Sequence, residues 1–169
     1  AKQNYDNLKS MIKTRSSIVF TKNKNKLGYE YAVVFDPVYS KPEVARNFDP
    51  SSKRLGSIDF SENLTVIRNG KLSDVMNIEE KDVVYKVSDI WNKYSYILAE
   101  NDRVGGKITA ISPDKLSPKT LGIDGKDYSF NENVEYSKLN YTPGSFNVDD
   151  IVVALLGYDG KIVDLDYPG

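Results

Sequence analysis

The reactive side chains of this sequence are mainly carboxylates, because the chain contains no cysteine and no histidine. That composition excludes thiol nucleophiles, the usual zinc ligand sets and every catalytic triad that needs an imidazole. Two Ser-x-x-Lys matches, Ser10 to Lys13 and Ser112 to Lys115, lack the other elements of a serine acylase. We therefore predict no catalytic residue and no enzymatic activity. A pair of carboxylates that hydrolyses glycosides stays open as a weaker alternative.

Acidic residues stand directly before two apolar runs, at Asp82 and at Asp150. With three neighbouring acids, Glu79, Glu80 and Asp149, they could offer the hard oxygen ligands that calcium prefers. The sequence contains no EF-hand loop, however, and aspartate in such a place commonly closes a turn by accepting a backbone hydrogen bond. We expect Asp82 and Asp150 to be structural turn residues, and we predict no metal site and no cofactor.

A cluster of aromatic residues, Trp91, Tyr94 and Tyr96, is a candidate for ligand binding. If residues 94–98 form a strand, Tyr94 and Tyr96 point to the same face. An exposed row of rings could stack on sugars, so a carbohydrate-binding module is the alternative function. A partly buried cross-strand cluster is the more common interpretation of this spacing.

Glycine-based turn signals recur along the chain and predict β-hairpins. The three pairs are Asn69-Gly70, Asp124-Gly125 and Asp159-Gly160. We expect these glycines to adopt positive φ, which side chains of other residues tolerate poorly. The last pair lies in the clearest hairpin, where residues 151–156 run out and residues 161–165 return. Both faces of residues 151–156 are apolar, which is typical of a central strand in a barrel or sandwich.

Short strands separated by turns predict an all-β fold, mainly antiparallel, built from small barrels or sandwiches. The spacing of Tyr5, Leu8 and Met11 adds a minor helix over residues 4–14. We expect a hairpin over residues 18–35 and a long loop over 36–56. The chain divides into an N-terminal β-rich module, residues 1–103, and a C-terminal barrel-like module, residues 104–169.

The overall charge argues against a nucleic-acid partner, because 23 basic residues are balanced by 24 acidic ones. No apolar run approaches the roughly 20 residues that a membrane-spanning helix needs. The chain begins at Ala1 without a signal peptide, so we expect an excised piece or a processed form. Residues 77–84 and 147–152 also echo each other, each with an acidic stretch before a β-branched run, which predicts a reused turn.

Several motifs appear in an order that resembles the β-rich modules beside S-layer homology repeats in surface proteins of Gram-positive, clostridia-like bacteria. They are Val66 to Lys71, Ile78 to Tyr85, Arg103 to Ile108, Ser112-Pro113, Ser117-Pro118, Ile123 to Tyr128, and the hairpin from Val148 to Val163. The resemblance covers roughly residues 57–167.

This resemblance implies a secreted, extracellular module at the bacterial cell surface, in the S-layer or the cell wall. Such a module is structural and non-catalytic, and it spaces or presents neighbouring domains of the same protein. Its expected partners are those domains and cell-wall polysaccharide. The S-layer homology repeat itself does not occur in this sequence, so anchoring to the wall is not carried over.

Overall fold

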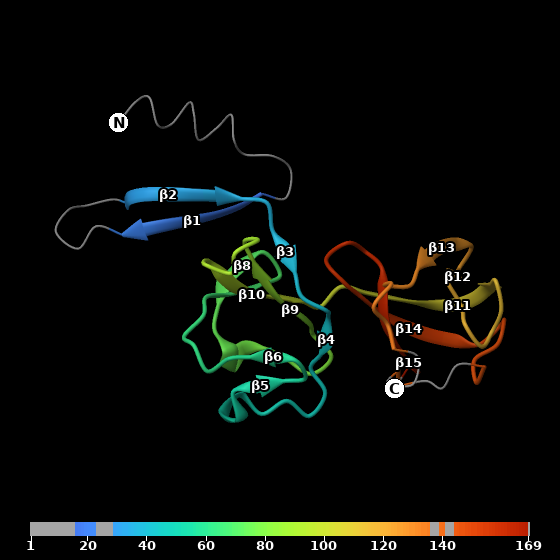
Figure 1. The fold of residues 1–169 in the computed structure, drawn as a ribbon. Helices are drawn as coiled ribbons and strands as arrows, with labels where there is room; N and C mark the ends of the chain where they lie inside the picture. Colours follow the sequence, from blue (N-terminus) through green and yellow to red (C-terminus); the bar gives the residue numbers. More distant parts are fainter. Residues whose placement is uncertain (1–15, 23–28, 136–138, 141–143, 169) are drawn as a thin grey trace.

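The computed structural model describes residues 16–22, 29–135, 139–140 and 144–168, and their fold is mainly β (Figure 1). This agrees with the predicted fold class. Most strand pairs are antiparallel. The described part of the chain contains two short 3-10 turns, η1 (Pro50–Ser52) and η2 (Val75–Asn77), and no α-helix. The helix predicted over residues 4–14 lies outside the described residues.

An antiparallel hairpin opens the described chain and extends away from the two larger sheets in Figure 1. It consists of β1 (Ser17–Lys22) and β2 (Tyr29–Phe35). Both strands are rich in β-branched and aromatic residues, which favour extended backbone. The hairpin predicted over residues 18–35 is therefore present.

A six-stranded sheet forms the first lobe, in the order β3-β9-β10-β7-β8 with β4 also paired to β9. Its strands are β3 (Val38–Tyr39), β4 (Glu43–Val44), β7 (Val66–Arg68), β8 (Lys71–Ser73), β9 (Val83–Ser88) and β10 (Ser95–Glu100). A small ribbon, β5 (Arg54–Leu55) with β6 (Ile58–Asp59), covers part of its core. The prediction of a long loop over residues 36–56 is wrong in part, because β3, β4 and η1 lie within that range.

A five-stranded antiparallel sheet forms the second lobe, in the order β13-β12-β11-β14-β15. Its strands are β11 (Arg103–Ser112), β12 (Thr120–Ile123), β13 (Lys126–Ser129), β14 (Ile151–Leu156) and β15 (Ile162–Asp166). The sheet curls until Phe130 and Ile162 form one isolated bridge, but the described strands do not close a barrel. The barrel that we expected is thus replaced by a curled open sheet.

The turn signals lie where the sequence places them. Asn69 and Gly70 join β7 to β8 with φ of 49° and 75°, and Asp124 and Gly125 join β12 to β13 with φ of 48° and 81°. Two consecutive positive φ angles match the twist of an antiparallel pair. Gly160, in the turn between β14 and β15, has φ of 75°.

The echo between residues 77–84 and 147–152 corresponds to one turn that is used twice. Asp82 Oδ2 accepts the Glu79 backbone N–H at 2.9 Å, and Asp150 Oδ2 accepts the Asn147 backbone N–H at 2.6 Å. The residue before each aspartate has positive φ, 70° in one turn and 77° in the other. Each turn leads directly into a central strand, β9 in the first lobe and β14 in the second.

Each lobe has its own apolar core, and a third cluster joins the two. Val83, Tyr85 and Val87 on β9 pack with Leu155 on β14 and Val163 on β15. All five are buried. The boundary between the sheets falls at residues 101–102, next to the predicted module boundary, but this shared cluster makes the lobes continuous.

Candidate functional site

A group of charged side chains lies at the junction of the two lobes. Asp164 and Asp166 are two residues apart on β15, so their side chains leave the strand on one face. Each residue is only 3% exposed. A buried carboxylate is costly unless it is paired and hydrogen-bonded, so its partners determine what it can do.

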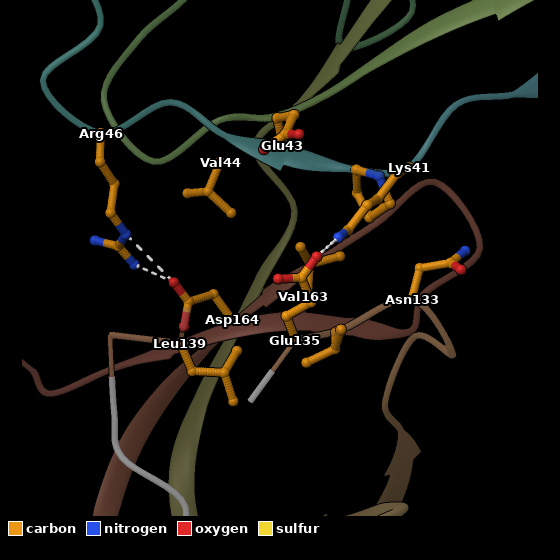
Figure 2. A pocket seen from close by; sticks show the side chains of 11 residues that line it. Lys41, Glu43, Val44, Arg46, Asn133, Glu135, Leu139, Val163 and Asp164 are labelled. Carbon is orange, nitrogen blue, oxygen red and sulfur yellow. Dashed lines mark hydrogen bonds and ion pairs between the residues drawn. The ribbon is translucent and has the colours of Figure 1, made fainter. Parts of the chain in front are cut away.

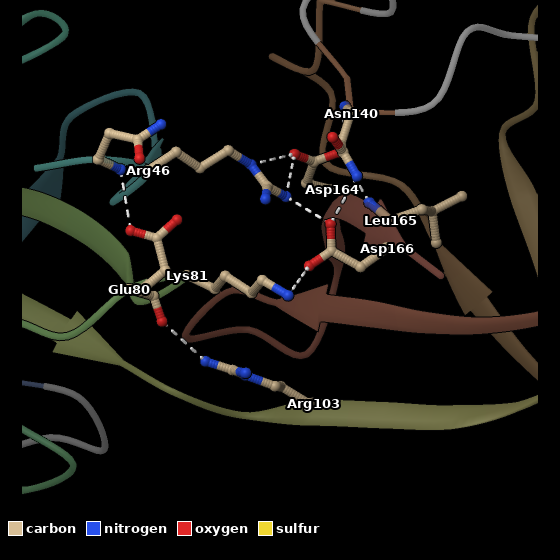
Figure 3. Close-up of polar contacts among 9 residues, drawn as sticks. Arg46, Glu80, Lys81, Arg103, Asn140, Asp164, Leu165 and Asp166 are labelled. Atoms are coloured by element: carbon tan, nitrogen blue, oxygen red, sulfur yellow. Dashed lines mark hydrogen bonds and ion pairs between the residues drawn. The ribbon is translucent and has the colours of Figure 1, made fainter. Parts of the chain in front are cut away.

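Two cations of the first lobe bind these carboxylates (Figure 3). Arg46 Nη2 lies 2.9 Å from Asp164 Oδ2 and 2.8 Å from Asp166 Oδ1. Lys81 Nζ lies 2.9 Å from Asp166 Oδ2. Arg46 follows β4 and Lys81 occupies the turn before β9, so both come from the first lobe. We call these four residues the junction ion cluster.

Asn140 supplies further hydrogen bonds to the same two carboxylates. Its backbone N–H donates to Asp164 Oδ1 at 2.9 Å, and its side-chain Nδ2 donates to Asp166 Oδ1 at 2.8 Å. The backbone N–H of Leu165 also donates to Asp164 Oδ1, at 2.8 Å. Hydrogen bonds of this kind stabilise an ion pair that is removed from water.

The pKa values in the cluster favour permanent charge. Burial alone would raise the pKa of Asp166, but hydrogen bonds from Lys81 and Arg46 outweigh burial and leave it lowered. Burial likewise opposes the charge of Arg46, and its bonds to the two aspartates leave its pKa raised. A general acid needs a carboxyl whose pKa is raised toward neutrality. Asp166 is therefore suited to holding charge rather than to transferring protons.

Backbone contacts hold the two cation-bearing segments together. The Lys81 N–H donates to the Ala45 carbonyl at 2.6 Å, and the Ala45 N–H donates to the Asp82 carbonyl at 2.9 Å. Arg103, at the start of the second lobe, donates from Nη2 to the Glu80 carbonyl at 3.2 Å. The turn that ends in Asp82 is thus fixed on both sides.

Asp82 has a partner that the sequence did not reveal. Arg68 on β7 binds its carboxylate in two-pronged fashion, from Nε at 2.7 Å and from Nη2 at 3.1 Å. Arg68 also lies 3.0 Å from Glu79 Oε2. Asp82 is fully buried, so this arginine provides its compensating charge. The one hint of this pair in the sequence was the position of Arg68, directly before the Asn69-Gly70 turn.

The apolar half of the junction is built from tyrosines. The rings of Tyr39 and Tyr158 stack with centroids 3.7 Å apart, and Tyr85 meets Tyr158 edge-on at 5.1 Å. The Tyr85 hydroxyl lies against Gly157, where a Cβ would collide with it. Burial, with the nearby charge of Asp159, raises the pKa of Tyr85, so the phenol stays neutral.

A cleft of about 170 Å³ lies between the lobes, beside the ion cluster. Lys41, Glu135, Leu139 and Val163 line this cleft, and Lys41 pairs with Glu135 (Figure 2). Arg46 and Asp164, which also line the cleft, bind each other. The charged groups that line the cleft are thus largely committed to contacts within the protein.

The structure separates the three aromatic residues proposed for sugar binding. Trp91 is 83% exposed on the turn between β9 and β10. Tyr94 and Trp91 both line a groove next to this turn, and the Tyr94 ring stacks on Phe35 with centroids 6.3 Å apart. Tyr96 instead forms a hydrogen bond through its hydroxyl to Ser17 Oγ at 3.0 Å and packs against the apolar cluster that joins the two lobes. Only two of the three residues share a groove.

The proposed calcium ligands do not form a group. In the described ranges, no set of three or more acidic side chains is arranged to hold a metal ion. Within those ranges, no helix combines the length and apolar character that crossing a membrane requires. Comparison of the chain with protein-family models, with curated proteins and with solved structures finds no match.

Proposed function

We propose that this chain is a structural, non-catalytic module of a bacterial cell-surface protein, in the S-layer or the cell wall. It spaces or presents neighbouring domains of the same protein, which are its partners. The observation that carries this proposal is the junction ion cluster, in which Arg46 and Lys81 bind two buried carboxylates of the other lobe. Two lobes held at a fixed angle keep the distance between whatever is attached to them.

The uses of the acidic residues support a non-catalytic role. Asp82 neutralises Arg68 and closes a turn, and Asp150 closes the equivalent turn. Asp164 and Asp166 join the lobes. These four carboxylates therefore stabilise the fold.

The location at the cell surface rests on the order of motifs between about residues 57 and 167, which resembles modules that accompany S-layer homology repeats. In the fold, this region includes β7 to β10 and the whole second lobe. Several of these motifs form turns and strands of the two lobes.

Surface labelling tests the proposal directly. An antibody against the purified chain, applied to intact cells that produce it, should bind before any permeabilisation. Labelling that appears only after permeabilisation would contradict the location. The purified chain should also release no soluble sugar or peptide from wall preparations, and steady turnover of either polymer would contradict the non-catalytic role.

A further inference from the structure

A rigid turn between β9 and β10 holds Trp91 out toward solvent. Asp89 Oδ1 accepts the backbone N–H groups of Lys93 at 2.6 Å and Tyr94 at 2.8 Å. The Asp89 carbonyl accepts the N–H of Asn92, whose φ is 54°. These bonds fix the loop while leaving the indole 83% exposed, so the ring is presented rather than packed.

A groove of about 730 Å³ runs beside this indole, between the turn and the end of the β1–β2 hairpin. Phe35 and Tyr94 line this groove, and their rings are nearly parallel, with an interplanar angle of 15°. Lys93 Nζ lies 5.5 Å from the centre of the Tyr94 ring. Asp36, also on the groove, is exposed and forms no ion pair or hydrogen bond within the described residues.

We propose that this groove binds a neutral saccharide, with one face of a pyranose ring stacked on Trp91. A pyranose combines an apolar C–H face with a rim of hydroxyls, and binding sites for such ligands pair apolar surface with a few placed polar groups. Here the indole supplies the flat surface. Asp36 accepts hydrogen bonds from hydroxyl groups, and Lys93 donates to their oxygens.

The size of the patch favours a sugar over a protein partner. The exposed apolar side chains at the groove are Trp91, Ile90 and Val38. A stable protein interface buries about 800 Å² on each partner, which is far more than three side chains supply. An oligosaccharide needs only one or two rings in contact. This site is independent of the spacer role and of the junction ion cluster.

The chain has a single tryptophan, so its intrinsic tryptophan emission reports on this groove alone. Titration with chitotetraose, cellohexaose and a soluble β-1,3-glucan should change the emission saturably for at least one of them. In the protein without added sugar, acrylamide should quench the emission of Trp91 efficiently. No emission change at millimolar sugar with any of the three, or an indole shielded from acrylamide, would overturn the proposal.

Calorimetry on variants then assigns the contacts. Trp91→Ala should weaken binding about tenfold or more, and Asp36→Asn should weaken it severalfold. Asp127→Asn, at an exposed aspartate on β13, and Tyr96→Phe should leave the affinity unchanged. Unchanged affinity in Trp91→Ala would overturn the site. So would emission that shifts with protein concentration as dimers form, because a second copy would then cover the groove.

Discussion

Asp82 and Asp150 close the same turn, but they differ in what else binds them. Asp82 is fully buried and carries the bidentate contact from Arg68, whereas Asp150 accepts the Asn147 N–H from a half-buried position. The contribution of the turn bond can therefore be separated from that of the ion pair. The sequence indicated the turn at both places, because an aspartate before a β-branched run is a local pattern. It did not indicate Arg68, which is 14 residues from Asp82 along the chain.

Replacing each aspartate by alanine should give unequal losses of stability. Asp82→Ala leaves Arg68 largely buried without its main partner, so we expect a loss of about 3 kcal/mol in the free energy of unfolding. Asp150→Ala removes a single side-chain to backbone hydrogen bond and should cost about 1 kcal/mol. Urea unfolding of both variants measures the difference. Equal losses would show that Arg68 adds nothing to the turn.

At the scale of elements, the hairpins were predictable and the pairing between them was not. Asn69-Gly70 and Asp124-Gly125 fix local geometry, so β7 with β8 and β12 with β13 follow from a few adjacent residues. The parallel pairing of β7 with β10 joins segments that are far apart in the sequence, so no local pattern predicts it. The same holds for Arg46, whose carboxylate partners are 118 and 120 residues away.

Besides its apolar packing on β9, the hairpin of β14 and β15 places Gly157 directly against the Tyr85 hydroxyl, which predicts a coupled pair of mutations. Gly157→Ala places a Cβ against the Tyr85 hydroxyl and should cost about 2 kcal/mol through overpacking. Tyr85→Phe removes the colliding oxygen, so the double variant should be more stable than the two single effects predict when added. Strictly additive losses in urea unfolding would contradict this contact.

At the scale of the whole molecule, the junction ion cluster should make stability depend on pH. Because the folded-state pKa of Asp166 is lowered, its contribution is fully present above the unfolded value of about 3.9. That contribution is lost as the pH falls through the folded-state value. Asp166→Asn should therefore be less stable than the parent at neutral pH, by about 1–3 kcal/mol.

The difference between Asp166→Asn and the parent should shrink as the pH falls below about 4, because the carboxylate of the unfolded parent is protonated first and that of the folded parent only at lower pH. Asp127→Asn, on the exposed strand β13, is the matched control and should follow the parent at every pH. Chemical unfolding across the acid range measures both curves. A gap that stays constant with pH would mean that the charge of Asp166 does not stabilise the fold.

The apolar cluster and the ion pairs between the lobes predict that the two lobes form one rigid body, and residual dipolar couplings of the backbone amides test this most directly. The couplings of the first lobe, residues 38–100, and of the second lobe, residues 103–166, should fit one alignment tensor when they are calculated from the structure described above. A variant with Arg46→Met and Lys81→Met should lower that agreement while each lobe still fits by itself. Two different tensors in the parent chain would contradict a spacer of fixed shape.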